Sequence, residues 1–243
     1  MSSNVTNPRV AIIVQARMGS TRFPGKILKE IVGAETVLGY LLKRLSSSKH
    51  ANKIIVATTT NPKDNVLESW LKKNGYLFYR GNEDDCLDRF YQICAYYNVD
   101  IAVRITSDCP LVVPEVVDDM IFYYLNNYHE IDYLSNRQYT NFPEGIDVEI
   151  FSTKILTEAA ENAVLKKERE HINYYFLNRD TQYRVRYYNH NLGFDYSRFK
   201  LSIDTYEDIE RVRSLFKEKG LPLDFSLLQL IGVLQTEEQR EQL

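Results

Sequence analysis

Hydrophobic residues form short continuous runs that alternate with amphipathic stretches over the first half of the chain. The run Val10–Val14 contains the unbroken apolar stretch AIIV, typical of a strand covered on both faces. From Thr36, a suitable helix cap, leucines instead recur at helical spacing. Strands joined by helical crossovers build a doubly wound, mostly parallel sheet, whose ligands bind beyond the carboxyl ends of the strands. The predicted strands are Val10–Val14, Lys53–Thr58, Tyr76–Tyr79 and Asp100–Thr106, and the predicted helices are 36–45, one through Trp70 that stops at Asn74-Gly75, 84–97 and 115–126.

The regular alternation of strands and helices ends after Tyr128, where strand-like pieces flank two helices. The strand-like pieces are Asp132–Ser135, Asp147–Phe151 and Tyr183–Tyr188, and the two helices are Thr153–Val164 and Glu168–Asn178. After them we expect a strand at Lys200–Ile203, a helix at Thr205–Lys219 and a last helix from about Phe225. Aromatic side chains are frequent here, including Tyr174, Tyr175, Phe176, Tyr183, Tyr187 and Tyr188. They fit an insertion that carries substrate contacts or a subunit interface, although packing in the monomer core is the commoner explanation.

The length and composition narrow the class of protein. A chain of 243 residues fits one large α/β domain. Its 30 Lys and Arg against 33 Asp and Glu give a net charge of −3, without the positive excess typical of nucleic-acid binding. The three cysteines lack a C-x-x-C pair, and the polar first residues contain no signal-like or membrane-spanning stretch. We therefore expect a cytoplasmic protein that binds neither nucleic acid nor a membrane.

The loop Gln15–Lys26, QARMGSTRFPGK, directly follows the first strand. Its two glycines, two hydroxyls, two arginines and one lysine are the donors that a polyphosphate requires. It is not a Walker A loop, because five residues separate Gly19 from Gly25 and Ile27 stands where a metal-binding hydroxyl is needed. The chain also lacks G-x-G-x-x-G. A solvated basic loop is the alternative interpretation.

Two aspartates each follow a predicted strand. Asp108 lies in TSDCP at the end of the fourth strand, where a carboxylate can bridge Mg²⁺ to phosphate oxygens, or can serve as a turn or helix cap. Asp204 ends the strand Lys200–Ile203, and Asp204-x-x-Glu207 also fits a capping box. We expect the basic loop and both acids to face a common cleft.

Further carboxylates and a histidine are weaker candidates. Asp147 and Glu149 share one face if their segment is a strand, and the alternative is the wet side of an edge strand. His171 lies on a predicted helix, where a packed or surface histidine is the commoner case. The chain contains neither a zinc-type histidine spacing nor the G-x-S-x-G of a serine hydrolase.

Together these motifs resemble the cytidylyltransferases related to CMP-Kdo and CMP-acylneuraminate synthetases, and among them the spore-coat polysaccharide branch. The resemblance rests on QARMGSTRFPGK, RGNEDDCLDRF, RITSDCPL, EGIDVEIFS, the REH helix and LSIDTYEDIE, in that order along nearly the whole chain. It implies one α/β nucleotidyltransferase domain, residues 1–243, with a Rossmann-like sheet of the nucleotide-diphospho-sugar transferase type. It also implies a small inserted acceptor or dimerisation segment at about 130–198, and a homodimer. The implied reaction is Mg²⁺-dependent transfer of CMP from CTP to an acceptor oxygen of a sugar, sugar acid or phosphorylated small molecule, in surface polysaccharide biosynthesis.

The resemblance also carries roles onto individual residues. Arg17, Lys26, Asp108 and Asp204 become the catalytic residues, and the two aspartates become the metal ligands. The nucleotide-binding residues are Gln15, Ala16, Arg17, Gly19, Ser20, Thr21, Arg22, Lys26, Ser107 and Asp108, and the acceptor-binding residues are Asp88, Arg89, Asp147, Glu149, Arg169 and His171. Sugar-acid enzymes of the family usually have G-D-x-P where this chain has S-D-C-P, which keeps the metal role but leaves the acceptor open.

Two other functions remain open from the sequence. A nucleotide-sugar-dependent glycosyltransferase uses a similar sheet, but it normally has a D-x-D pair, whereas Asp84-Asp85 and Asp118-Asp119 are adjacent. A non-catalytic nucleotide-binding module is the second alternative, although no motif is missing.

Overall fold

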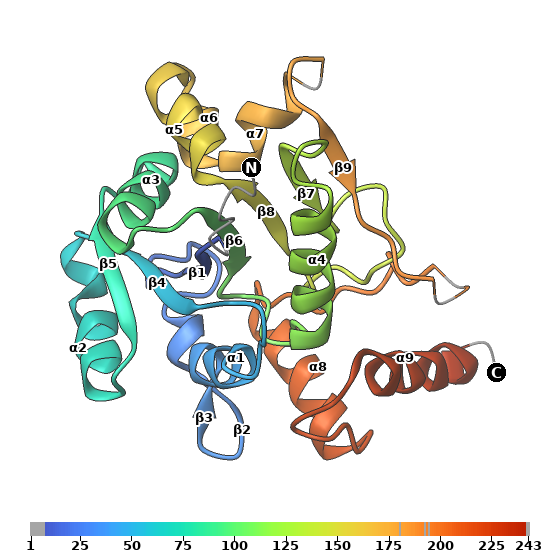
Figure 1. Ribbon diagram of the computed structural model, residues 1–243. Helices are drawn as coiled ribbons and strands as arrows, with labels where there is room; N and C mark the ends of the chain where they lie inside the picture. The colour runs from blue at the N-terminus through green and yellow to red at the C-terminus, as the bar shows by residue number, and fades with distance from the viewer. Residues whose placement is uncertain (1–7, 180, 192, 194, 242–243) are drawn as a thin grey trace.

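A seven-stranded sheet with the order β5-β4-β1-β6-β8-β7-β9 runs through the centre of the molecule (Figure 1). The computed structural model describes residues 8–179, 181–191, 193 and 195–241. The strands are β1 (Val10–Gln15), β4 (Lys53–Thr59), β5 (Leu77–Gly81), β6 (Ile101–Thr106), β7 (Tyr133–Ser135), β8 (Glu149–Ser152) and β9 (Val185–Tyr187). The pairs β5·β4, β4·β1, β1·β6 and β7·β9 are parallel, and β8 runs antiparallel to both of its neighbours. The predicted doubly wound, mostly parallel α/β sheet is confirmed.

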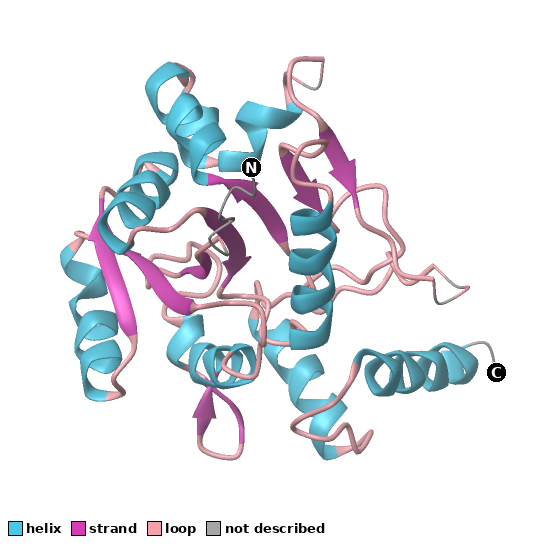
Figure 2. Ribbon diagram, viewed as in Figure 1, coloured by secondary structure: helices cyan, strands magenta, loops and turns pink. Residues whose placement is uncertain are grey.

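Helices cover both faces of this sheet (Figure 2). The helices are α1 (Val37–Leu45), α2 (Asn65–Lys73), α3 (Cys86–Tyr97), α4 (Pro114–Asn126), α5 (Thr153–Asn162), α6 (Lys166–Glu170), α7 (Ile172–Leu177), α8 (Tyr206–Lys217) and α9 (Leu227–Glu241). The core with α1, α2, α4, α8 and α9 contains Ile12 and Val14 of β1, whereas the core with α3, α5 and α7 contains Ala11 and Ile13. Burial on both faces explains why β1 is an unbroken apolar run. No helix among the described residues is long and apolar enough to cross a membrane.

One element was not predicted, and two local predictions are wrong. A short hairpin of β2 (Glu30–Val32) and β3 (Glu35–Thr36) precedes α1 and was not expected. The helix predicted over Glu168–Asn178 divides into α6 and α7, because His171 has an extended backbone with ψ +96°. The segment Lys200–Ile203 is not a strand, because its backbone bonds to two different loops: Leu201 N donates to Glu144 O, and Ile203 N to Asp108 O.

The segment around Asp147 and Glu149 also differs from the sequence interpretation. β8 starts only at Glu149 and lies between β6 and β7, so it is not an edge strand. The side chain of Asn136 accepts from Val148 N at 2.7 Å and donates to Ile146 O at 2.8 Å. These side-chain bonds take the place of backbone ladder bonds in the residues just before β8. Neither carboxylate faces open solvent, since Glu149 is buried and Asp147 is mostly covered.

Aromatic residues of the middle segment pack mainly inside the monomer. Tyr175, Phe176 and Tyr183 are buried in one cluster with Tyr133 and Phe151. This confirms the commoner of the two explanations for these three rings.

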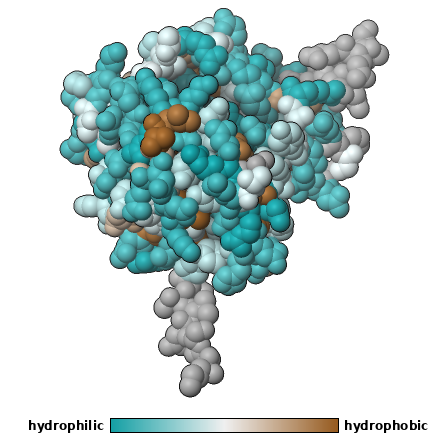
Figure 3. Space-filling model, turned by 90° about the horizontal axis from the view of Figure 1, so that it is seen from above, coloured by the Kyte–Doolittle hydropathy of each residue, from teal (hydrophilic) through white to brown (hydrophobic). Residues whose placement is uncertain are grey.

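Seen from above, the surface of the molecule is mostly hydrophilic, with a small hydrophobic patch (Figure 3).

Gly145 offers a direct test of how the segment before β8 packs. Its φ is +102°, and a Cβ at this position would lie 2.5 Å from the backbone nitrogen of Ser202. We expect Gly145→Ala to lower the free energy of unfolding by about 2–3 kcal/mol, measured by urea unfolding. Gly33→Ala is the control, because Gly33 has φ +58° with no atom within 4 Å of its Cβ position. That variant should lose about 1 kcal/mol, and equal losses in the two variants would contradict the packing argument.

Asp147 predicts a pH dependence of stability. Burial raises the pKa of its carboxyl from 3.8 to about 6, against the opposing effect of Arg137. The folded state therefore binds more protons than the unfolded state between these values, so this group's contribution to stability falls as pH rises from about 4 to 7. We expect Asp147→Asn to gain about 2 kcal/mol relative to the wild type over this interval, in urea unfolding at several pH values. Asp224→Asn, at an exposed aspartate, is the control, and a difference for Asp147→Asn that stays constant over this pH interval would refute the assignment.

Candidate active site

The candidate site lies where the strand order reverses, at the carboxyl ends of β1 and β6. These neighbouring parallel strands leave the sheet into the basic loop and into the segment of Asp108. Ser107 N donates to Gln15 O at 3.0 Å, which joins the two segments as they leave the sheet. Doubly wound sheets bind ligands at such a point.

The carboxylate of Asp64 holds the basic loop in place, and this residue is buried, with 1% of its surface exposed. One of its carboxylate oxygens accepts from Met18 N at 2.7 Å, and the other is bound by the hydroxyl of Thr59. Met18 O in turn accepts from the backbone nitrogens of Ser20 and Gly25, so the loop closes on itself. Sequence analysis missed Asp64, and the available signal was a carboxylate in the loop after the second predicted strand.

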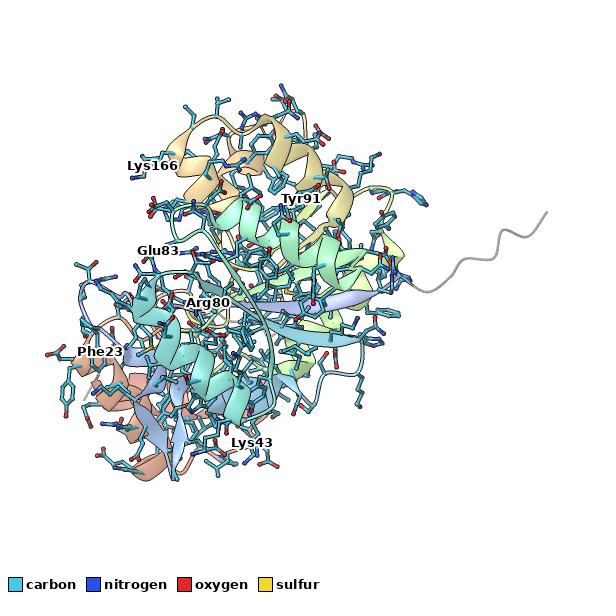
Figure 4. The ribbon with its side chains drawn as sticks, turned by 90° about the vertical axis from the view of Figure 1, so that its left-hand side faces the viewer. Phe23, Lys43, Arg80, Glu83, Tyr91 and Lys166 are labelled. Carbon is cyan, nitrogen blue, oxygen red and sulfur yellow. The ribbon has the colours of Figure 1, made fainter. Side chains whose placement is uncertain are left out.

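A second contact holds Arg17, whose guanidinium lies 3.5 Å from the carboxylate of Glu83. Glu83 also accepts from the side chain of Asn61. Glu83 and the neighbouring Arg80 lie on the side of the molecule formed by β5, α2 and α3 (Figure 4). Glu83 was also missed as a site residue, although it belongs to the RGNEDD motif.

Lys26 is the centre of the site. Gly25, with φ +70°, turns the chain into a short 3₁₀ helix that begins with Lys26. The ammonium of Lys26 lies 3.0 Å from Asp108 Oδ2 and 3.3 Å from Asp204 Oδ1, and it also donates to Ile203 O. Both acids therefore meet at one lysine, as expected from the sequence, but only Asp108 lines the adjoining cavity.

Asp204 is surrounded by cations. Arg22 lies 3.1 Å and Lys200 3.2 Å from its carboxylate. Burial opposes its ionisation, but the charges of Lys26 and Lys200 outweigh burial and lower the pKa of the Asp204 carboxyl. The predicted capping role of Asp204 is wrong, because Thr205 caps α8 and Asp208 completes the capping box. The carboxylate of Asp204 is thus free of the capping role and pairs with these cations.

A half-open cavity of about 300 Å³ lies over Lys26, Arg22 and Asp108. It is lined by Gln15, Arg17, Gly19, Ser20, Thr21, Arg22, Lys26, Ile27, Thr106, Ser107 and Asp108. Nine of the ten predicted nucleotide-binding residues are in this lining. The exception is Ala16, whose side chain is in the core and whose backbone nitrogen donates to Ala57 O at 3.0 Å.

The six predicted acceptor-binding residues are not brought together. The acceptor contact predicted for Arg89 is wrong, because this residue is only 2% exposed, packs against Gly81 and donates to Asn82 O. The acceptor contact predicted for Glu149 is wrong as well, because its carboxylate is buried and bound by Arg104 and Tyr133.

The other four acceptor predictions remain untested. Arg169 binds Asp85 at 2.6 Å, and Asp88 accepts from Gln92 at 3.2 Å. Asp147 lies 3.7 Å from Arg137, and His171 is exposed at the break between α6 and α7. None of these four lines the cavity over Lys26.

Oxygen ligands for a hard cation are present at the site. Asp108 and Asp204 already share one cation, the ammonium of Lys26. The part of the chain that the structure describes contains no group of three or more His, Cys, Asp or Glu able to hold a metal ion. Two carboxylates nevertheless fit Mg²⁺, which commonly takes its remaining ligands from water and substrate phosphates.

Comparisons with known proteins identify the family. A family model described as Cytidylyltransferase matches residues 11–242. Spore coat polysaccharide biosynthesis protein SpsF of Bacillus subtilis (strain 168) is 32% identical over 230 residues, which cover 93% of each chain. A cytidylyltransferase structure from Leptospira borgpetersenii serovar Hardjo-bovis (strain JB197) matches with a TM-score of 0.89 at 37% identity, over 96% of each chain.

A more distant structure shares the fold. CMP:2-keto-3-deoxy-manno-octonic acid synthetase complexed with CTP matches with a TM-score of 0.68 at 16% identity, over 87% of this chain and 99% of that one. The family model spans nearly the whole chain, and two relatives above 30% identity cover more than nine-tenths of it. The chain therefore belongs to the cytidylyltransferase family and is a nucleotidyltransferase.

Proposed function

We propose that this enzyme transfers CMP from CTP to an acceptor oxygen, with release of pyrophosphate and dependence on Mg²⁺. The observation that carries the proposal is the meeting of Lys26 with Asp108 and Asp204 under the basic loop. Cytosine as the base is supported by the family and by the related fold that was determined with CTP. Membership of this family contradicts the glycosyltransferase alternative.

The residues of the cavity divide into two groups by charge. Arg17, Arg22 and Lys26 supply fixed positive charge to the triphosphate, and Ser20 and Thr21 add hydroxyl donors. Attack on the α-phosphorus increases negative charge on the bridging and leaving oxygens. Cations held in place before the reaction stabilise that charge without reorganisation. No covalent intermediate on the protein is required.

Asp108 and Asp204 would hold the metal ion, which supplies charge neutralisation to the phosphate oxygens when bound. Their negative charges pair with Lys26 and, at Asp204, also with Arg22 and Lys200. The lysine therefore keeps the two carboxylates close together before the substrate enters.

The acceptor is proposed to be a sugar, sugar acid or phosphorylated small molecule used in surface polysaccharide biosynthesis. The name of the Bacillus subtilis relative supports the pathway. We also propose a cytoplasmic homodimer of single-domain chains, in which segment 130–198 provides acceptor contacts or the subunit interface. In support, β9 ends the sheet without a further strand among the described residues, and the nearby Tyr139 is 84% exposed.

Asp108→Asn tests the catalytic centre. The substitution removes one of the two negative charges beside Lys26, so we expect kcat to fall by about 10²–10³-fold. The measurement is pyrophosphate release from CTP, Mg²⁺ and a panel of sugar, sugar-acid and phosphorylated acceptors. Asp224→Asn, an exposed aspartate before α9, is the control and should retain full activity. A wild-type enzyme that binds CTP but releases no pyrophosphate with any acceptor would contradict the proposed reaction.

Asp204→Asn tests the metal site. We expect EDTA to stop pyrophosphate release and added Mg²⁺ to restore it in the wild type. The variant should need on the order of 10- to 100-fold more Mg²⁺ for half-maximal activity, because one carboxylate charge is lost. Titration of Mg²⁺ at saturating CTP measures this shift, with Asp224→Asn again as the control. An unchanged Mg²⁺ requirement would exclude Asp204 as a ligand.

A further inference from the structure

A buried polar network lies beneath one end of the cavity. Arg104 of β6 and Glu149 of β8 form an ion pair in which 6% and 3% of the two side chains are exposed. Tyr133 of β7, also buried, donates its hydroxyl to the other oxygen of Glu149. Arg104 directs its remaining donors toward β1, where Nε and a terminal nitrogen lie 3.2 and 3.0 Å from Gln15 Oε1. Four strands thus contribute to one chain of contacts that ends in the cavity wall.

Arg104 fixes which end of the Gln15 amide faces the cavity. A guanidinium donates hydrogen bonds and accepts none, so the amide oxygen of Gln15 must point toward it. The amide nitrogen then points away from Arg104, and Gln15 lines the cavity. Within the described part of the chain, no group accepts a hydrogen bond from this nitrogen. Gln15 therefore offers the substrate a fixed donor.

The charge beneath this donor is balanced. Glu149 neutralises Arg104, whereas Arg17, Arg22 and Lys26 in the same cavity wall are the phosphate-type cations. An uncharged donor above a neutral pair suits a carbonyl or ring nitrogen better than a phosphate. A buried ion pair adds little to stability compared with apolar residues of similar size. Its contribution here is the orientation of Gln15.

We propose that Gln15 donates from its amide nitrogen to the acceptor edge of cytosine, O2 and N3, and thereby favours CTP over UTP. Uracil keeps the O2 acceptor, but its N3 carries a hydrogen, so the fixed donor would lose the N3 acceptor and face a donor there. The inference rests on the proposed use of CTP. Arg104 and Glu149 are positioning residues in this scheme, which gives Glu149 a role different from the acceptor contact predicted from the sequence.

Gln15→Leu tests the contact directly. We expect the Kd for CTP with Mg²⁺, measured by calorimetry, to rise on the order of 10- to 100-fold, because the base loses its hydrogen-bond partner. The Kd values for UTP and ATP should change less than threefold. Gln182→Leu, an exposed glutamine outside this cavity, is the matched control and should change none of them. An unchanged Kd for CTP, or an equal loss for UTP or ATP, would overturn the proposal.

A second variant tests the positioning role. Arg104→Met, Tyr133→Phe and Glu149→Leu together remove the network without leaving an unpaired buried charge. We expect a folded protein with a similar Tm that has lost its preference for CTP over UTP to the same extent as Gln15→Leu. Adding Gln15→Leu to this variant should cause no further loss. A network-free protein that keeps the wild-type CTP preference would refute the role of Arg104 and Glu149.

The two proposals fail in different ways. If the wild type binds CTP no more tightly than ATP and releases no pyrophosphate, the proposed function is wrong. If the wild type prefers CTP and Gln15→Leu keeps that preference, the function stands and the base contact is wrong.

Discussion

The ammonium group of Lys26 joins three parts of the chain that lie far apart in sequence. It pairs with Asp108, 82 residues away, and with Asp204, 178 residues away. Both carboxylates are partly covered, so each would repel the other without a cation between them. The turn at Gly25 delivers the lysine to this position, and the backbone bond from Ile203 N to Asp108 O brings the two acids together. The site is thus assembled by charge balance before any ligand binds.

The rest of the cavity wall depends on a rigid frame behind it. Asp64 holds the backbone of the basic loop at Met18, and Glu83 holds the side chain of Arg17. Because these supports are carboxylates outside the cavity lining, they fix the loop without neutralising Lys26. Electrostatic preorganisation requires cations that are held in place before the reaction, and these supports fix the loop that carries them.

Sequence patterns predicted the parts of the fold that depend on local periodicity. The buried run of β1 and the Thr36 cap of α1 were correct, as was the convergence of the loop with Asp108 and Asp204. Predictions failed where the backbone departs from regular strand pairing or helix geometry. Asn136 takes the ladder bonds ahead of β8, and His171 interrupts a helix whose residues have helical periodicity. Neither event leaves a signal in the pattern of apolar residues.

Glu149 shows why a polar residue in a strand is ambiguous. From the sequence, Glu149 was either an acceptor contact or part of the wet side of an edge strand. Instead β8 lies inside the sheet, where an unpaired carboxylate would be costly. The missing information was the partner: Arg104 on β6 pairs with it in register across the antiparallel ladder. Arg104 was equally visible in RITSDCPL as a charged residue within an apolar strand. Two opposite charges on predicted buried strands are therefore a signal for a paired network, and in this sheet that network ends at Gln15 in the cavity wall.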